Sequence, residues 1–380
     1  MTVQRTFAGF VAIVSAIATT TARAQDSTHA DSSAKPAHAA PPPNRTAAPS
    51  YPLDPTTVFD VHSFKPTPAL SGYISVRSTR RDGVTGFLLN RGRLTAVAAP
   101  KPFFAIRLQG DFSGAQTGKL RSDSTVAGFT LTDAYVELVA PPKMVAKGSL
   151  LEQLHPSIIA GQFKTPFSLE YLTSFSLLET ANRSQVVDSL SQKRDIGAQA
   201  QIGWKQYATL TAAVVNGEGA NATSNANGTV MYLSRLTITP LSWLEISGKI
   251  EREKTDHAWG YDVRALWHGL TLEGEGIYRK RPTKATVFTD GGGGYALIAY
   301  KVTSWLEPVY KYDRYYATSF TSGNPTTTTI VSSSHTWNVF GVNVLTTPEW
   351  LRVQLDYNRR NEKPSPGRSN EYIAQVIAIF

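Results

Sequence analysis

Cysteine is absent from all 380 residues of this sequence. The chain therefore has no disulfide framework, no thiolate metal site and no cysteine nucleophile. The backbone hydrogen bonds and side-chain packing must hold the fold together unaided.

Long hydrophobic runs are missing as well, with one short exception at the N-terminus. Arg5 precedes an apolar run over residues 7–18, and the small-residue sequence Ala22-Arg23-Ala24 follows it. This order is typical of a secretory signal peptide over residues 1–24. The alternative, a membrane anchor, needs roughly 20 apolar residues.

Large apolar residues are scarce in the next segment, 25–57, which is rich in Ala, Pro, Ser and Thr. Such a composition buries too little apolar surface to offset the entropy of ordering the chain. We expect a disordered N-terminal segment over 25–57, followed by a folded domain over 58–380.

No spacing typical of metal ligands is present, so we expect no metal and no cofactor. An outer-membrane hydrolase would need a nucleophile with a positioned histidine. His257 and His335 could lie on outer loops, the latter beside Ser332–Ser334, but loops rich in Ser are common. The glycine-rich residues 290–294 precede no helical pattern, which favours a loop tip over a phosphate loop.

Alternation of apolar and polar residues dominates the chain from about Leu70 onward. The period of two predicts strands with one apolar face, and segments of about 9 to 11 residues suit tilted strands that cross a bilayer. Sixteen strands are predicted near 70–79, 86–97, 103–113, 131–140, 157–164, 194–204, 207–216, 230–240, 243–254, 258–268, 270–280, 293–303, 305–316, 335–346, 350–361 and 370–380.

The links between these segments alternate in length, as in bacterial barrels that join short inner turns with long outer loops. Two links depart from the pattern: 141–156 is long for an inner turn, and 255–257 is short for an outer loop. Tryptophan, which prefers the membrane interface, flanks the short turns. These residues, expected at one rim, are Trp204, Trp243, Trp267, Trp305 and Trp350.

Charged residues stand opposite the apolar stripes. Arg or Lys on the lipid face would cost about 2 to 4 kcal/mol at mid-bilayer, so we expect these charges to line a water-filled lumen. A soluble β-sandwich would carry the same alternation but not sixteen long strands. The lumen is mixed in sign, although removal of Arg5 and Arg23 leaves the net charge at +7, down from +9. This balance points to anionic solutes or anionic lipid rather than nucleic acid.

Several motifs occur in order along the chain: N-R-G-R-L (90–94), G-Q-F-K-T-P-F-S-L-E-Y-L-T-S (161–174), N-R-S-Q-V-V-D (182–188), R-D-I-G-A-Q (194–199) and V-N-G-E-G (215–219). With a final strand that ends in Phe380, the chain resembles the phosphate-selective porin O and P family of outer-membrane proteins. The resemblance implies an all-β, sixteen-stranded antiparallel transmembrane barrel, often trimeric, with the third outer loop folded inward. That loop is 165–193 here, and its Phe167, Leu169, Tyr171, Phe175, Leu177 and Leu178 are too apolar for a free surface loop.

The resemblance also implies an anion-binding ladder of Arg and Lys. The matching residues are Lys164, Arg183 and Arg194 around the loop, and Arg91, Arg93 and Arg107 on the wall. Guanidinium groups bind phosphate bidentately. Four acids lie among these cations, namely Glu170, Glu179, Asp188 and Asp195, and each is an alternative partner for them.

We therefore predict a bacterial outer-membrane porin for passive diffusion of small hydrophilic solutes, with a preference for anions such as phosphate, in contact with outer-membrane lipid. The alternatives are a general, non-selective porin and a structural barrel with a plugged lumen.

Overall fold

The computed structural model describes residues 68–112, 129–141, 144–282, 287–322, 328–346, 349–364 and 367–380. The predicted signal peptide (1–24) and the predicted disordered segment (25–57) lie outside the described residues. No helix in these ranges has the length and apolar character needed to cross a membrane.

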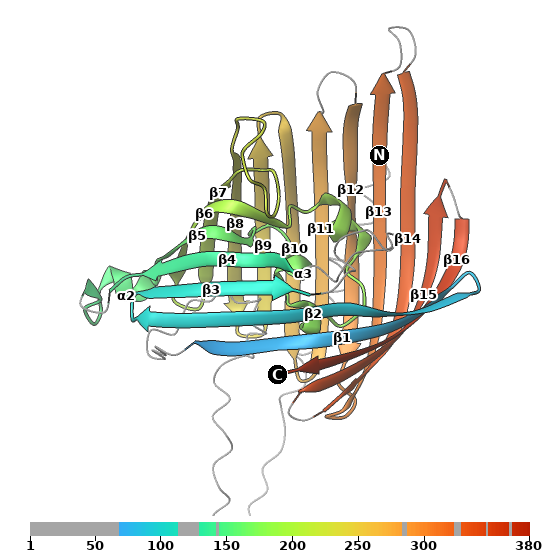
Figure 1. Ribbon diagram of the computed structural model, residues 1–380, viewed down its shortest axis with the longest axis horizontal. Helices are drawn as coiled ribbons and strands as arrows, with labels where there is room; N and C mark the ends of the chain where they lie inside the picture. The colour runs from blue at the N-terminus through green and yellow to red at the C-terminus, as the bar shows by residue number, and fades with distance from the viewer. Residues whose placement is uncertain are drawn as a thin grey trace, which may run out of the picture. The chain divides into compact units, whose positions relative to one another are not determined.

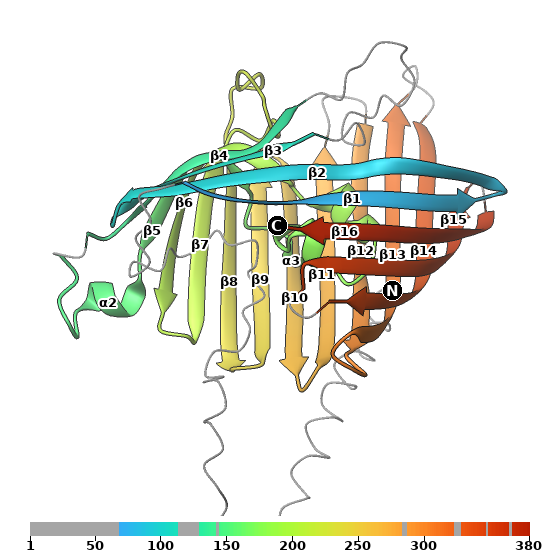
Figure 2. The ribbon, with the colours of Figure 1, turned by 60° about the horizontal axis from the view of Figure 1, so that its bottom comes forward.

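Sixteen antiparallel strands pair in sequence order, and β1 pairs with β16 to close the barrel (Figures 1 and 2). The first eight are β1 (Ala69–Arg81), β2 (Val84–Lys101), β3 (Phe104–Asp111), β4 (Thr130–Val139), β5 (Ser157–Lys164), β6 (Arg194–Trp204), β7 (Ala208–Val215) and β8 (Met231–Leu241). The others are β9 (Leu244–Glu253), β10 (Asp256–Trp267), β11 (Leu270–Pro282), β12 (Val287–Tyr300), β13 (Leu306–Ser322), β14 (Thr328–Leu345), β15 (Leu351–Lys363) and β16 (Gly367–Ile379). Each predicted segment overlaps one of them, so the predicted barrel is confirmed.

Four short helical segments occur in the described parts of the links, and they lie in two of these links. They are α2 (Leu150–Leu154) between β4 and β5, and α3 (Leu169–Leu172), η4 (Phe175–Leu177) and α4 (Gln185–Leu190) between β5 and β6. The link at 141–156, which is long for an inner turn, thus contains α2. The short link between β9 and β10 is a tight turn in which Lys254 has a φ of 50°.

The predicted loop tip at residues 290–294 is wrong, because these residues lie within β12. A Cβ on Gly291 would come within 2.9 Å of Leu190 Cδ2, and one on Gly294 within 2.6 Å of the Glu275 carbonyl oxygen. The glycine run therefore makes room for α4 and for the neighbouring strand, which a reading of turn propensity does not anticipate.

The two faces of the strands differ in polarity. In β9, Ile246 and Ile250 are 46% and 62% exposed, whereas the alternate residues Ser247, Lys249 and Glu251 are buried. In a closed barrel, the buried charged side chains point into the lumen and the exposed apolar ones face lipid. The expected orientation of the stripes is thereby confirmed.

The five tryptophans predicted for one rim lie at five alternate turns. Trp204 and Trp267 end β6 and β10, whereas Trp243, Trp305 and Trp350 directly precede β9, β13 and β15. Alternate turns of an antiparallel barrel share a rim, and all five side chains are exposed. The predicted placement of these tryptophans at one rim is therefore confirmed.

Leu236, near the middle of β8 and 45% exposed, provides a test of the lipid-facing surface. Leu236→Arg should lower the free energy of unfolding by about 2 to 4 kcal/mol, because the guanidinium would be placed near the bilayer midplane. Urea unfolding in phospholipid vesicles measures this change. Leu236→Met is the matched control and should change stability little, whereas equal effects of Arg and Met would contradict the lipid-facing assignment.

Candidate functional site

The segment between β5 and β6, residues 165–193, is buried along most of its length. Five of the six apolar side chains singled out from the sequence are buried; Leu177 is partly exposed. Ser168 accepts a hydrogen bond from the Tyr171 backbone N–H at 3.2 Å and so caps α3. In both views α3 is drawn within the ring of strands (Figures 1 and 2).

Polar side chains on the buried face of distant strands hold this segment. Arg264 of β10 donates to Thr173 Oγ1 at 2.7 Å, and Arg352 of β15 donates to the Leu178 carbonyl at 2.7 Å. Ser168 donates to Glu275 of β11 at 3.0 Å. The segment therefore contacts strands well beyond β5 and β6, which it joins.

Tyr171 is the centre of the candidate site. The charged groups of Lys164, Arg183 and Arg194 lie 5.7, 4.9 and 5.6 Å from the centroid of its ring. Arg194 Nη1 also donates to the Tyr171 hydroxyl at 2.7 Å. The electron-rich face of an aromatic ring attracts cations, so that three of them gather around one side chain.

A second ring continues the arrangement. Phe175 has Arg91 at 4.3 Å and Arg183 at 5.8 Å from its centroid, and it stacks on Tyr73 of β1 at 6.4 Å. Arg93 lies 5.6 Å from the Tyr73 ring. We call Tyr73, Tyr171 and Phe175 with these five cations the cation–aromatic cluster.

Two aspartates supply carboxylates to the cluster. Asp111 Oδ2 lies 2.6 Å from Arg93 and 3.4 Å from Arg91. Asp133 lies 2.6 Å from Arg194 and 3.5 Å from Arg107, the sixth cation predicted from the sequence. The structure thus brings all six predicted cations to the cluster or to its edge.

Arg183 differs from its neighbours in its partners. Its Nε donates to the Glu170 carbonyl and its Nη2 to the Thr173 carbonyl, both at 3.2 Å. Among the described residues, it forms no ion pair, and its Nη1 donates no hydrogen bond. The Arg183 Nη1 therefore keeps an open donor, and in the same cluster the Nε atoms of Arg91 and Arg93 are buried without a hydrogen-bond partner.

The four acids near the predicted cations bind elsewhere. Glu170 pairs with Lys311 at 3.1 Å, Glu179 with Arg352 at 3.4 Å, and Asp188 with Lys193 at 3.4 Å. Asp195 accepts hydrogen bonds from Gln192 and from the Gly219 backbone. The structure therefore gives each of these acids a partner other than Arg183.

Sequence reasoning missed two residues of this region, Tyr73 and Arg77 of β1. Both lie on the inward face, at the two-residue spacing that places Ser75 between them. The strand was predicted, so its period could have placed them in the lumen. Their contacts with residues 175 and 181–182 depend on tertiary structure and leave no local signal.

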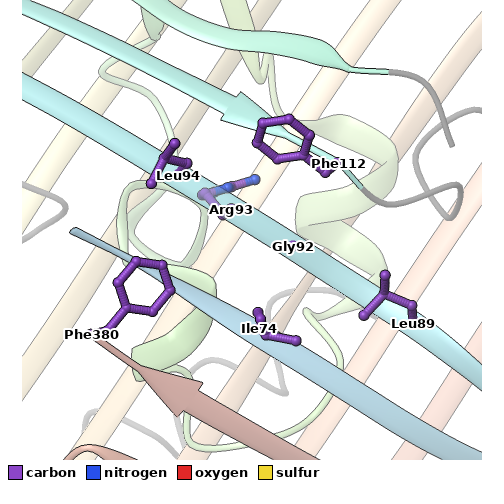
Figure 3. A pocket seen from close by; sticks show the side chains of 7 residues that line it. All are labelled: Ile74, Leu89, Gly92, Arg93, Leu94, Phe112 and Phe380. Carbon is purple, nitrogen blue, oxygen red and sulfur yellow. The ribbon is translucent and has the colours of Figure 1, made fainter. Parts of the chain in front are cut away.

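The outer face offers a different environment. A hollow of about 330 Å³ lies beside the C-terminus, with an apolar lining of Ile74, Leu89, Leu94, Phe112 and Phe380 around Gly92 (Figure 3). These exposed apolar side chains suit lipid rather than a hydrophilic solute.

Comparison with known proteins agrees with the sequence motifs. The family model described as "Phosphate-selective porin O and P" matches residues 103–259, so the predicted resemblance to this family is confirmed over that part of the chain. No curated protein sequence matches the chain.

Solved structures of porins share the fold. An anion-selective porin from Comamonas acidovorans is similar with a TM-score of 0.56 and 12% identity, over 83% of this chain and 99% of that one. OmpT of Vibrio cholerae with loop L8 deleted gives 0.57 and 10%, over 83% and 99%. OmpF of Salmonella typhi with daunomycin gives 0.54 and 10%, over 82% and 97%. At such low identity, these likenesses show the fold alone.

The cation–aromatic cluster can be tested by a double-mutant cycle of Phe175→Leu and Arg91→Met. Each change keeps most of the apolar volume, and the pair should show a coupling of about 0.5 to 2 kcal/mol from the lost cation–π contact. Urea unfolding of the four proteins measures the coupling. A coupling near zero would mean that Arg91 and Phe175 are neighbours without a stabilising interaction.

Proposed function

We propose that the pore of this barrel passes small anions and prefers phosphate. The proposal starts from two findings: residues 103–259 match the phosphate-selective porin O and P family, and the sixteen strands close into a barrel. The family and the fold indicate a channel rather than an enzyme. The observation that carries the preference for anions is Arg183, a buried guanidinium with an open donor beside four other cations.

The segment 165–193 is proposed to narrow the pore. Its side chains contact inward-facing residues of β10 and β11, and its Leu178 carbonyl contacts Arg352 of β15, so the segment occupies part of the cross-section that the strands enclose. A permeating ion then passes close to whichever groups the segment presents. Charges at a constriction outweigh those at a wide mouth, because screening in the wide part acts over about 8 to 10 Å.

The sign of the charge near the segment supports anions. The cation–aromatic cluster has five cations, and Asp111 and Asp133 lie against three of them. The rings stabilise the cations by their quadrupoles and so contribute no negative charge of their own. We infer a positive potential at the cluster, which raises the local concentration of anions.

Phosphate fits the donor set. A guanidinium offers planar, paired donors that match two oxygens of a tetrahedral oxyanion, and the charge-assisted bonds offset its desolvation. The guanidinium groups of Arg91 and Arg183 both lie within 6 Å of the Phe175 ring centroid. We propose that they form the binding step, with Arg194, Lys164, Arg93 and Arg107 around it.

A general, non-selective porin is the second candidate, and one observation favours it. Wall cations outside the cluster are neutralised in pairs, for example Arg235 with Asp262 at 2.7 Å and Arg264 with Glu273 at 2.7 Å. If such pairs dominate the pore, its selectivity should be weak. We also propose a homotrimer, since OmpT of Vibrio cholerae, which shares the fold, has a solved trimer form.

Arg183→Ala should weaken phosphate block of the chloride current by at least about fivefold, because a unit charge at ~4 Å contributes about 1 kcal/mol even in bulk water. The block is measured on single channels in planar bilayers, as the chloride current against phosphate concentration. Arg183→Ala combined with Arg107→Ala should reduce anion preference further.

Lys193→Ala is the matched control, because Lys193 lies in the same segment but is exposed and paired with Asp188. It removes one positive charge and should leave the phosphate block close to the wild-type value. Equal weakening by Lys193→Ala and Arg183→Ala would favour net charge over a binding step. An unchanged block in Arg183→Ala would favour the non-selective porin.

A further inference from the structure

Residues 181–185, at the middle of the segment that carries Arg183, are held through their backbone by charged side chains. Ala181 and Ser184 are fully buried. A buried backbone needs hydrogen-bond partners, which in most loops come from neighbouring backbone or water. Here several of them come from the barrel wall.

Strand β1 supplies the first contact. Arg77 Nη1 donates to Asn182 Oδ1 at 2.7 Å, Nη2 donates to the Ala181 carbonyl, and Nε donates to Gln375 of β16 at 2.8 Å. All three nitrogens of this guanidinium are therefore engaged in hydrogen bonds. Arg77 therefore holds the segment in place, whereas Arg183 has an Nη1 that donates no hydrogen bond.

Strands β13 and β15 supply the others. Asp356 of β15 accepts from the Ala181 N–H at 2.8 Å. In β13, Lys311 donates to the Asn182 carbonyl at 2.7 Å, and Asp313 accepts from the Gln185 N–H at 2.6 Å. Both neighbours of Arg183 in the sequence are thus tied to the barrel or to the segment, since Glu170 accepts from Ser184 N–H and Oγ, each at 2.7 Å.

We propose that Arg77, Lys311, Asp313 and Asp356 act as a charged clamp that positions Arg183 at the narrow part of the pore. The clamp contains two cations and two acids, so it adds no net charge. Its charged groups strengthen the bonds to the backbone of residues 181–185. The inference rests on the proposed function, because it assigns these residues to the selectivity of the same pore.

The clamp predicts that the effect of replacing Asp356 depends on which residue replaces it. If Asp356 acted only through its charge, removing it from an anion pore would favour anions, whichever residue replaced it. If Asp356 acts by accepting from Ala181, the outcome depends on whether the replacement retains an acceptor oxygen. Asparagine retains one and alanine does not.

The experiment compares Asp356→Asn with Asp356→Ala in the full-length protein, in planar bilayers. Asp356→Asn should keep the wild-type conductance and an anion preference at least as strong as the wild type. Asp356→Ala should raise the conductance and shift the reversal potential in a salt gradient toward zero, because the segment and Arg183 are released. Heat-dependent migration on gels checks that each barrel is closed.

Asp313→Asn and Asp313→Ala provide a second pair, on the Gln185 N–H, should Asp356→Ala fail to fold. Glu371→Gln and Glu371→Ala are the matched control, since Glu371 of β16 accepts from Asn358 and Arg360 of β15. Those two variants should move the reversal potential in the same direction.

The clamp is overturned if Asn and Ala act alike at both Asp356 and Asp313 and favour anions with unchanged conductance. A wild-type pore without anion preference would instead refute the proposed function. In that case, a difference in conductance between the Asn and Ala variants would still show whether the clamp holds the segment in place.

Discussion

The pairing of β1 with β16 is the contact on which the rest of the molecule depends. Within a bilayer, an unpaired strand edge leaves N–H and C=O groups without water, so strands cross stably only when the sheet closes. The register runs from Tyr73 opposite Ile379 to Arg81 opposite Glu371. Closure also places Arg77 beside Gln375, near the middle of this seam.

Closure of the barrel gives the side chains on the two faces of the sheet different environments. The outer face must be apolar because it meets lipid, whereas the enclosed face can hold charges that would be unfavourable outside. Segment 165–193 then lies among charged groups rather than in an apolar core. It is fastened by Arg, Lys, Asp and Glu of the wall, and its own Tyr171 and Phe175 collect cations. The inward-facing charges that hold the segment thus lie beside those to which we assign the proposed selectivity.

Much of the fold could be predicted from the sequence because a strand's faces follow a period of two. That period identified all sixteen strands, and tryptophan marked one rim. The glycine run at 290–294 led to a wrong prediction of a loop tip. Its glycines allow close packing against Leu190 and the Glu275 backbone rather than a turn. A local pattern does not show whether glycine is needed for a turn or for space.

The cations of the site could be predicted from the sequence, but the acids with which they form ion pairs could not. The six cations came from family motifs, yet the alternatives named as their partners were acids close in sequence. The structure instead pairs Arg194 with Asp133, and Glu170 with Lys311, residues far apart in the chain. Such neighbours depend on the stagger of the closed barrel, which no single strand encodes. Arg77 was missed for the same reason, because its partners Ala181 and Asn182 are more than 100 residues away in the sequence.

The sign of the wild-type selectivity tests the account most directly. A planar bilayer that contains the purified protein separates two concentrations of potassium chloride, and the potential at zero current is measured. We predict a sign that corresponds to preferential passage of chloride, reduced in size when phosphate is added. A sign that corresponds to preferential passage of potassium would contradict a positive constriction at Arg183.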